Sequence, residues 1–98
     1  MNIQITGDNF ELTDNVKKLV DEKVNQKLEK FLITFAPEMK TAMLRIEYDK
    51  LKNIHLRFDM LLPGKKEIFS ETTHKFLESA LIDLEDQLEK QIKKYRDL

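Results

Sequence analysis

Residues 42–60, AMLRIEYDKLKNIHLRFDM, contain the pattern that decides the fold. Apolar side chains occupy every second position over residues 42–48 and again over residues 54–60, mostly with charged side chains between them. Strict alternation is typical of a β-strand with one buried face. The short polar segment between the two runs predicts an antiparallel pair. The face turned away from the core is expected to show water the side chains of Arg45, Glu47, His55, Arg57 and Asp59.

Segments on either side of this pair complete the predicted sheet and add a helix. Residues 3–6 alternate in the same way and end at Gly7, which predicts a short first strand. A turn signal at residues 63–64 precedes residues 66–70, which predict a short fourth strand. Residues 73–96 repeat apolar side chains at helical spacing and predict the last helix.

A first helix is expected between the first two strands. Thr13 is a suitable N-cap, Asp14 suits the positive end of a helix, and Pro37 ends it after about Phe35. Its apolar residues fall into two stripes rotated by roughly 100°, about one residue of helix. The stripes are Val16, Leu19, Val20 and Val24, followed by Leu28, Phe31, Leu32 and Phe35. This slip predicts a π-bulge or marked curvature near residues 24–27, and a broad stripe with gentle bending is the alternative.

The predicted element order is therefore β-α-β-β-β-α. Short connections make the last three strands an antiparallel meander whose apolar face needs a cover. We expect an α+β, two-layer domain, with a four-stranded sheet and two helices packed on one face. Residues 1–98 are long enough for one such domain and too short for two.

Composition excludes several classes of protein. Hydrophobic residues make up 41% of the chain and charged residues 36%, which is typical of a soluble, helix-rich domain. The absence of cysteine excludes disulfides, thiol nucleophiles and cysteine-ligated metal sites, and it fits a reducing cytoplasm. The first ten residues do not resemble a signal peptide, and no apolar run could span a bilayer.

Catalytic signatures are missing from the sequence. It has no glycine-rich phosphate loop, no nucleophile elbow and no His-x-x-x-His pair. We expect His55 on the exposed sheet face and His74 in the first turn of the last helix, both solvated or structural. The scattered carboxylates nominate no acid–base pair. We therefore expect a protein that is not an enzyme and needs no metal or cofactor.

Two groups of basic residues are the candidate binding site. The formal net charge is −1, so nucleic-acid binding would have to rest on a local patch. The first group, on one side of the first helix, comprises Lys23, Lys27 and Lys30. The second, near the end of the last helix, comprises Lys90, Lys93, Lys94 and Arg96. If the helices pack side by side, both groups could form one surface suited to phosphates.

A solvated helix face is the alternative explanation for these lysines. Acidic residues early in a helix and basic residues late in it also match the helix dipole. The outer face of the last helix changes from Asp83 and Asp86 to lysines in this order. Asp86 with Lys90, and Glu89 with Lys93, have the favourable i, i+4 arrangement of exposed ion pairs.

The chain resembles the ribosome hibernation-promoting factors in several segments. These are IQITGDN at residues 3–9, ELT at 11–13, KLEKF at 27–31, the Pro63–Gly64 turn and DLEDQLEK at 83–90. No single motif is strong, but their order and spacing extend over essentially the whole chain. Its length resembles the short form of the family, or a long form cut at the domain border.

The resemblance implies a ribosome-binding protein without enzymatic activity. Members of this family, including ribosome-associated inhibitor A, bind the small ribosomal subunit in the decoding channel. They block the messenger RNA and transfer RNA sites and so stop translation. The resemblance implies a cytoplasmic protein that is monomeric when free. Residues that match basic positions of the family are Lys23, Lys27, Lys30, Lys90, Lys94 and Arg96.

Three departures from the family pattern leave an alternative open. Asp83 and Asp86 stand where the family commonly has basic residues on the last helix. Thr72 and His74 replace an acidic residue and a tyrosine that open that helix, and the first helix is one residue longer before Leu28. Carboxylates beside a phosphate surface repel RNA. The alternative is a protein-interaction module of the same fold, with ribosome binding lost or altered.

Overall fold

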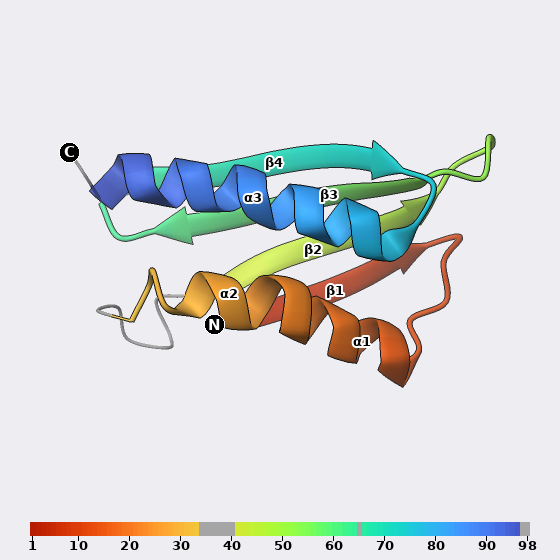
Figure 1. Cartoon of the computed structure of the whole chain (residues 1–98), viewed down its shortest axis with the longest axis horizontal. Helices are drawn as coiled ribbons and strands as arrows, with labels where there is room; N and C mark the ends of the chain where they lie inside the picture. Colours follow the sequence, from red (N-terminus) through yellow and green to blue (C-terminus); the bar gives the residue numbers. More distant parts are fainter. Residues whose placement is uncertain (34–40, 65, 97–98) are drawn as a thin grey trace.

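The structure is a computed structural model that describes residues 1–33, 41–64 and 66–96, with only the backbone described at residue 96. The elements are β1 (Asn2–Asp8), α1 (Asp14–Val20), η1 (Asp21–Asn25), α2 (Gln26–Glu29), β2 (Thr41–Tyr48), β3 (Ile54–Leu62), β4 (Lys66–His74) and α3 (Leu77–Arg96). The sheet order is β1-β2-β3-β4, with β1 parallel to β2 and the other neighbours antiparallel. Figure 1 shows α1–η1–α2 and α3 covering one face. The predicted α+β architecture is confirmed.

The central strands β2 and β3 alternate between core and open face as predicted. Leu44 of β2 lies opposite Phe58 of β3, and both are fully buried beneath the helices. On the open face, Arg45 forms an ion pair with Asp8 of β1 at 2.5 Å. The five side chains predicted on this face are exposed or half-buried: Arg45, Glu47, His55, Arg57 and Asp59. The predicted separation of a core face from a solvated face is therefore confirmed.

Strand β4 extends four residues beyond the predicted end at Ser70. It runs to His74, with Thr72 opposite Leu56 and Thr73 opposite His55 of β3. The predictions that the last helix begins at residue 73 and that His74 lies in its first turn are therefore wrong. Threonine is β-branched and pairs well across a sheet, so strand pairing continues here and α3 begins only at Leu77.

The phase slip in the first helix is a π-helical turn. Residues 21–25 form η1, and the Gln26 N–H bonds to the Asp21 carbonyl, five residues earlier. A π-helical turn contains about one residue more than an α-helical turn. Side chains four residues apart therefore stay on the core face. These are Val20, Val24, Leu28 and Leu32, each at most 2% exposed. The predicted π-bulge is confirmed, and it begins three residues earlier than expected.

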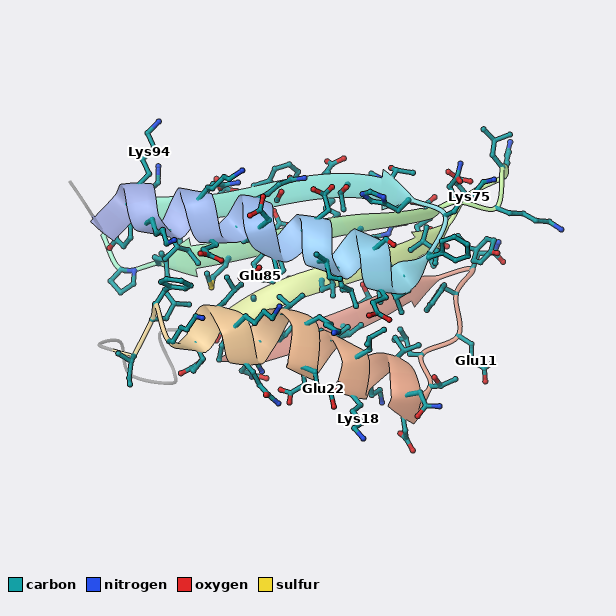
Figure 2. The ribbon with its side chains drawn as sticks, viewed as in Figure 1. Glu11, Lys18, Glu22, Lys75, Glu85 and Lys94 are labelled. Atoms are coloured by element: carbon teal, nitrogen blue, oxygen red, sulfur yellow. The ribbon has the colours of Figure 1, made fainter. Side chains whose placement is uncertain are left out.

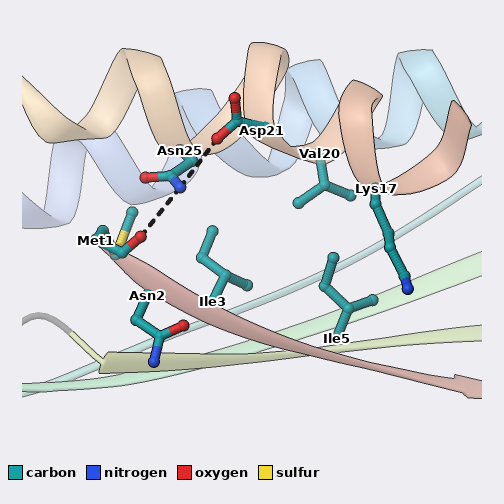
Figure 3. Close-up of a pocket in the computed structure, with 8 residues that line it drawn as sticks. All are labelled: Met1, Asn2, Ile3, Ile5, Lys17, Val20, Asp21 and Asn25. Carbon is teal, nitrogen blue, oxygen red and sulfur yellow. Dashed lines mark hydrogen bonds between the residues drawn. The ribbon is translucent and has the colours of Figure 1, made fainter. Parts of the chain in front are cut away.

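The π-turn also ties the helix to β1. Its Asn25 side-chain amide donates to the Met1 carbonyl at 3.0 Å and to Asp21 at 3.1 Å. Figure 3 shows these bonds at one end of a cavity of about 430 Å³ between β1 and the helix. The Thr13 hydroxyl accepts from the Val16 N–H at 3.2 Å, which confirms the predicted N-cap.

The end of the first helical segment differs from the prediction. Segment α2 ends at Glu29, and the N–H groups of Phe31 and Leu32 bond to carbonyls three residues earlier. This tighter winding turns Leu32 into the core. The expectation of a helix that continues to about Phe35 is therefore wrong, and Phe35 and Pro37 themselves lie outside the described residues.

The buried apolar side chains form one core between the sheet and the helices. Phe58 is the largest fully buried side chain, and Leu84 and Leu88 of α3 pack into the same cluster. In the part of the chain that the structure describes, no helix is both long and apolar enough to cross a membrane.

Candidate nucleic-acid interface

The three predicted lysines of the first helical segment lie on the side next to α3. Lys23 belongs to η1, Lys27 to α2, and Lys30 follows as the C-cap. The Lys23 ammonium lies 3.7 Å from the Glu78 carboxylate of α3, and its side chain is 30% exposed. Its stem therefore packs at the helix–helix boundary while its charge reaches across to α3.

Helix α3 presents a row of glutamates to these lysines. Lys23 pairs with Glu78, the charge of Lys27 acts on Glu85, and the charge of Lys30 acts on Glu89. We call these residues the interhelical seam: Lys23, Lys27, Lys30, Glu78, Glu85 and Glu89. The predicted lysine row therefore exists, but an acidic row of equal number lies opposite it.

Glu85 is the most deeply buried member of the seam. It lies between the two helices (Figure 2), is 8% exposed, and has one buried carboxylate oxygen with no hydrogen-bond partner among the described residues. Burial raises the pKa of Glu85, and the neighbouring Glu89 raises it further, while Lys27 acts in the opposite direction. A partly dehydrated negative charge therefore lies inside the candidate RNA surface.

We expect Glu85→Gln to stabilise the protein at neutral pH by about 1 kcal/mol, because it removes a buried charge without changing the side-chain shape. Because the folded-state pKa of Glu85 is raised, the wild-type carboxylate is destabilising above that pKa and becomes neutral as the pH falls. The advantage of the variant should therefore shrink below neutrality. Urea unfolding at several pH values measures the difference in free energy of unfolding between Glu85→Gln and wild type. A difference that grows on acidification would contradict the prediction.

Lys93 lies beside the C-terminal end of the seam. The ammonium groups of Lys30 and Lys93 lie 5.4 and 5.2 Å from the centre of the Phe31 ring. Lys93 also donates to Glu89 at 2.7 Å, and this bond raises the pKa of Lys93. Two cations from different helices thus share one aromatic ring, which draws α2 and α3 together.

Lys94 lies on the other side of α3, toward β4, and Lys90 lies on the exposed face of α3. Lys90 is 75% exposed and pairs with Asp86 at 3.1 Å, so the predicted i, i+4 pair forms. Lys94 lines a small cavity with Lys66 of β4, and Figure 2 shows it pointing away from the first helical segment. Arg96 lies in the last turn of α3, and its side chain is outside the description. The predicted basic surface is therefore divided by α3.

Asp83 does not belong to the open outer face where we expected it. Its Oδ2 accepts from the Thr72 hydroxyl at 2.5 Å and from the Gln87 amide at 3.2 Å, and lies 3.0 Å from His74 Nε2. Gln87 also bonds to the Ser70 hydroxyl. These bonds, led by that of Thr72, lower the pKa of Asp83. Asp83 therefore fastens α3 to β4.

The lowered pKa of Asp83 predicts an acid-sensitive contribution to stability. A carboxylate with a depressed folded-state pKa stabilises the fold above its unfolded pKa, and this stabilisation is lost as the pH falls through the folded pKa. We expect Asp83→Asn to cost about 1 kcal/mol at pH 7, a value discounted because the side chain is 40% exposed. The difference from wild type should shrink as the pH falls through the lowered pKa of Asp83. Asp86→Asn is the exposed control, and an equal effect of both would contradict the prediction.

The sequence matches the family model described as Sigma 54 modulation protein / S30EA ribosomal protein over residues 3–97. The chain belongs to this family. The match includes every described strand and helix except Asn2, the first residue of β1. It confirms the resemblance to hibernation-promoting factors that the motifs indicated. No curated protein sequence matches the chain.

Two solved structures resemble this S30EA family chain along its whole length. The N-terminal domain of Protein Y from Thermus thermophilus has 26% identity and a TM-score of 0.82, with 98% of this chain and 100% of that chain covered. A ribosomal subunit interface protein from Coxiella burnetii has 19% identity and a TM-score of 0.77, with both chains covered fully. At that lower identity, the second likeness shows the fold alone.

The sequence of this S30EA family protein did not place Glu78, Glu85, Glu89 or Lys66 at the candidate interface; Glu89 was expected only as the ion-pair partner of Lys93, and that pair forms. The three glutamates recur at i, i+7 and i+11, a spacing that places them along one side of a helix. That spacing was visible in the sequence, but the identity of the facing helix was not. Lys66 lies at the start of β4 and is distant in sequence from Lys94 of α3. The two residues line the same cavity only because the chain folds α3 against β4.

Proposed function

We propose that this protein is a ribosome-associated translation inhibitor that binds the small ribosomal subunit in the decoding channel and blocks the messenger RNA and transfer RNA sites. The observation that supports it most strongly is the match to the S30EA ribosomal protein family over residues 3–97. The Coxiella protein of the same fold is described as a ribosomal subunit interface protein. Inhibition by occupying space needs only a rigid domain and phosphate contacts.

Basic residues on both sides of α3 would supply those phosphate contacts. The proposed RNA-binding residues are Lys23, Lys27, Lys30, Lys90, Lys93, Lys94 and Arg96. Lys94 is exposed and forms no ion pair among the described residues, Lys90 is exposed and pairs with Asp86, and the seam lysines face glutamates. A phosphate that approaches the seam must compete with those carboxylates, so we assign the larger part of the affinity to the end of α3.

We infer that the protein acts by binding and not by catalysis. The carboxyl groups with displaced pKa values are those of Asp83, Glu85 and Glu89. Asp83 is bonded to Thr72 and Gln87 and holds α3 to β4, and the two glutamates face the lysines of the first helical segment, so these groups serve the packing of α3. We infer that the protein is monomeric when free and works in the cytoplasm, where its ribosomal target is found.

The second candidate function is a protein-interaction module of the same fold. The observation that favours it is the interhelical seam, where each lysine faces a glutamate and the local charge sums to zero. A neutral seam attracts RNA less than the predicted lysine row would. It is the seam glutamates, and not Asp83, that interrupt the positive surface.

Co-sedimentation with purified small subunits tests the proposed function. We expect binding at about 50 mM salt that weakens steeply toward about 200 mM, because phosphate contacts release counterions. Absence of binding at the lower salt concentration would overturn the proposal and favour the protein-interaction module.

Asp86→Lys separates the two candidates further. Asp86 is exposed and bonds only to Lys90 among the described residues, whereas changing Asp83 would also break the fastening of α3 to β4. A gain in ribosome affinity would show that this face of α3 lies near RNA and that Asp86 opposes binding. An unchanged affinity would place it away from the RNA.

A further inference from the structure

We propose that the cavity between the start of β4 and the last turns of α3 binds a backbone phosphate of RNA, with Lys66 and Lys94 as its cationic ligands. The identity of the ligand as ribosomal RNA rests on the proposed function above. The existence of an anion site does not, because it follows from the charges and hydrogen bonds around the cavity.

Hydrogen bonds between the two elements hold the cavity open in a defined shape. Its volume is about 230 Å³, and its lining consists of Lys66, Gln91, Lys94 and Tyr95. The Tyr95 hydroxyl donates to the Pro63 carbonyl in the β3–β4 turn at 2.7 Å. The Gln91 amide donates to the Phe69 carbonyl at 2.7 Å, and its oxygen accepts from the Phe69 N–H at 3.3 Å. The two lysines therefore project from elements that are fixed relative to each other.

The Gln91 side chain leaves a donor for an anion. A glutamine amide has two N–H groups, and one of those of Gln91 is used by the Phe69 carbonyl. The second is available beside the ammonium groups of Lys66 and Lys94. The carbonyl end of α3 carries a partial negative charge of roughly half a unit, which two ammonium groups outweigh.

Among the described residues, no carboxylate pairs with the ammonium group of Lys66 or Lys94. Within residues 1–33, 41–64 and 66–96, neither lysine forms an ion pair, whereas Lys90 and Lys93 pair with Asp86 and Glu89. Among the residues that the structure describes, no carboxylate lines the cavity. Among the α3 lysines, Lys94 is therefore the one whose charge is most available to a phosphate.

The cavity and the interhelical seam contact different parts of an RNA. They lie on opposite sides of α3, and a helix with its side chains is roughly 10–12 Å across. One phosphate cannot reach both sites. Bound RNA would therefore cross α3, with one phosphate in the cavity and others over the far side of the helix.

Lys66→Gln tests the cavity, with Lys50→Gln as the matched control. Both side chains are exposed, and Lys50 lies in the β2–β3 loop at the other end of β3, about 30 Å away along a strand of nine residues. We expect Lys66→Gln to weaken small-subunit binding by about tenfold and to flatten the slope of log affinity against log salt by about one unit. Lys50→Gln should change neither, and both variants should melt at the wild-type temperature.

Titration with inorganic phosphate provides a readout that does not involve the ribosome. At millimolar phosphate we expect saturable shifts of the Gln91 and Lys94 amide signals in NMR spectra, and their loss in Lys66→Gln. If wild type does not bind small subunits, the proposed function fails and this titration alone decides whether the cavity is an anion site. If wild type binds and Lys66→Gln behaves like Lys50→Gln on the ribosome, the inference is wrong although the proposed function stands.

Discussion

The double variant Lys90→Glu, Lys94→Glu is expected to lose about a hundredfold in affinity for the small ribosomal subunit at low salt. Two charge-assisted phosphate contacts are removed and two carboxylates take their place, at about 1.4 kcal/mol for each tenfold step. The salt slope should flatten by about two units. These side chains are exposed on α3, so the fold should persist. Co-sedimentation over a range of salt concentrations measures both quantities.

A second double variant, Lys18→Glu, Lys50→Glu, is the matched control because it changes the net charge by the same amount. Lys18 lies on α1 and points away from Lys94 on the opposite side of the molecule (Figure 2). We expect at most a small loss of affinity. An equal loss in both variants would show that only net charge matters. Wild-type affinity of the Lys90→Glu, Lys94→Glu variant for the small subunit would show that this end of α3 does not contact RNA.

Phe58→Ala is expected to have the largest effect on stability, about 3–5 kcal/mol. Phe58 is fully buried at the centre of β3, opposite Leu44 of β2 and Ser70 of β4, beneath the helices. Removing its ring leaves a cavity that neither the paired strands nor the helices can fill without breaking other contacts. A domain of this size is stable by roughly 5–15 kcal/mol, so a large part of its stability would be lost.

Urea unfolding followed by circular dichroism measures this loss. Leu61→Ala on the same strand is the control, because Leu61 is 60% exposed on the open face. It should change the free energy of unfolding by less than about 0.5 kcal/mol. Similar costs for both substitutions would mean that the helices do not press on the centre of the sheet.

Much of the fold could be predicted from local patterns. Alternation along β2 and β3 identifies strands and the face that each side chain takes, because side chains in a strand point to opposite faces in turn. The mismatch between the two stripes near Val24 indicated a π-turn or a gentle bend, and the structure has the π-turn, whose extra residue keeps both stripes on one face. Boundaries were harder to predict. Thr72 and His74 were assigned to the start of a helix, yet strand pairing and Asp83 hold both in β4.

The candidate site could be predicted only in part. The lysines were recognised as helix-face rows, and the ion pair of Asp86 with Lys90 was expected from spacing alone. The sequence could not show that Glu85 would be buried opposite Lys27, because the partner of each helix face depends on packing. Nor could it show that Lys66, distant in sequence, lies beside Lys94.

The sequence by itself determined the elements, the inward and outward side of each strand, and the family to which the chain belongs, because these depend on side-chain periodicity and short-range order. Only the tertiary structure decided which charges meet. Packing of α3 beside η1 and α2 sets Glu78, Glu85 and Glu89 against the lysine row, and its packing on β4 sets Lys94 beside Lys66. Electrostatic energy depends on distance in space, so the binding surface of this protein arises from contacts between segments far apart in its sequence.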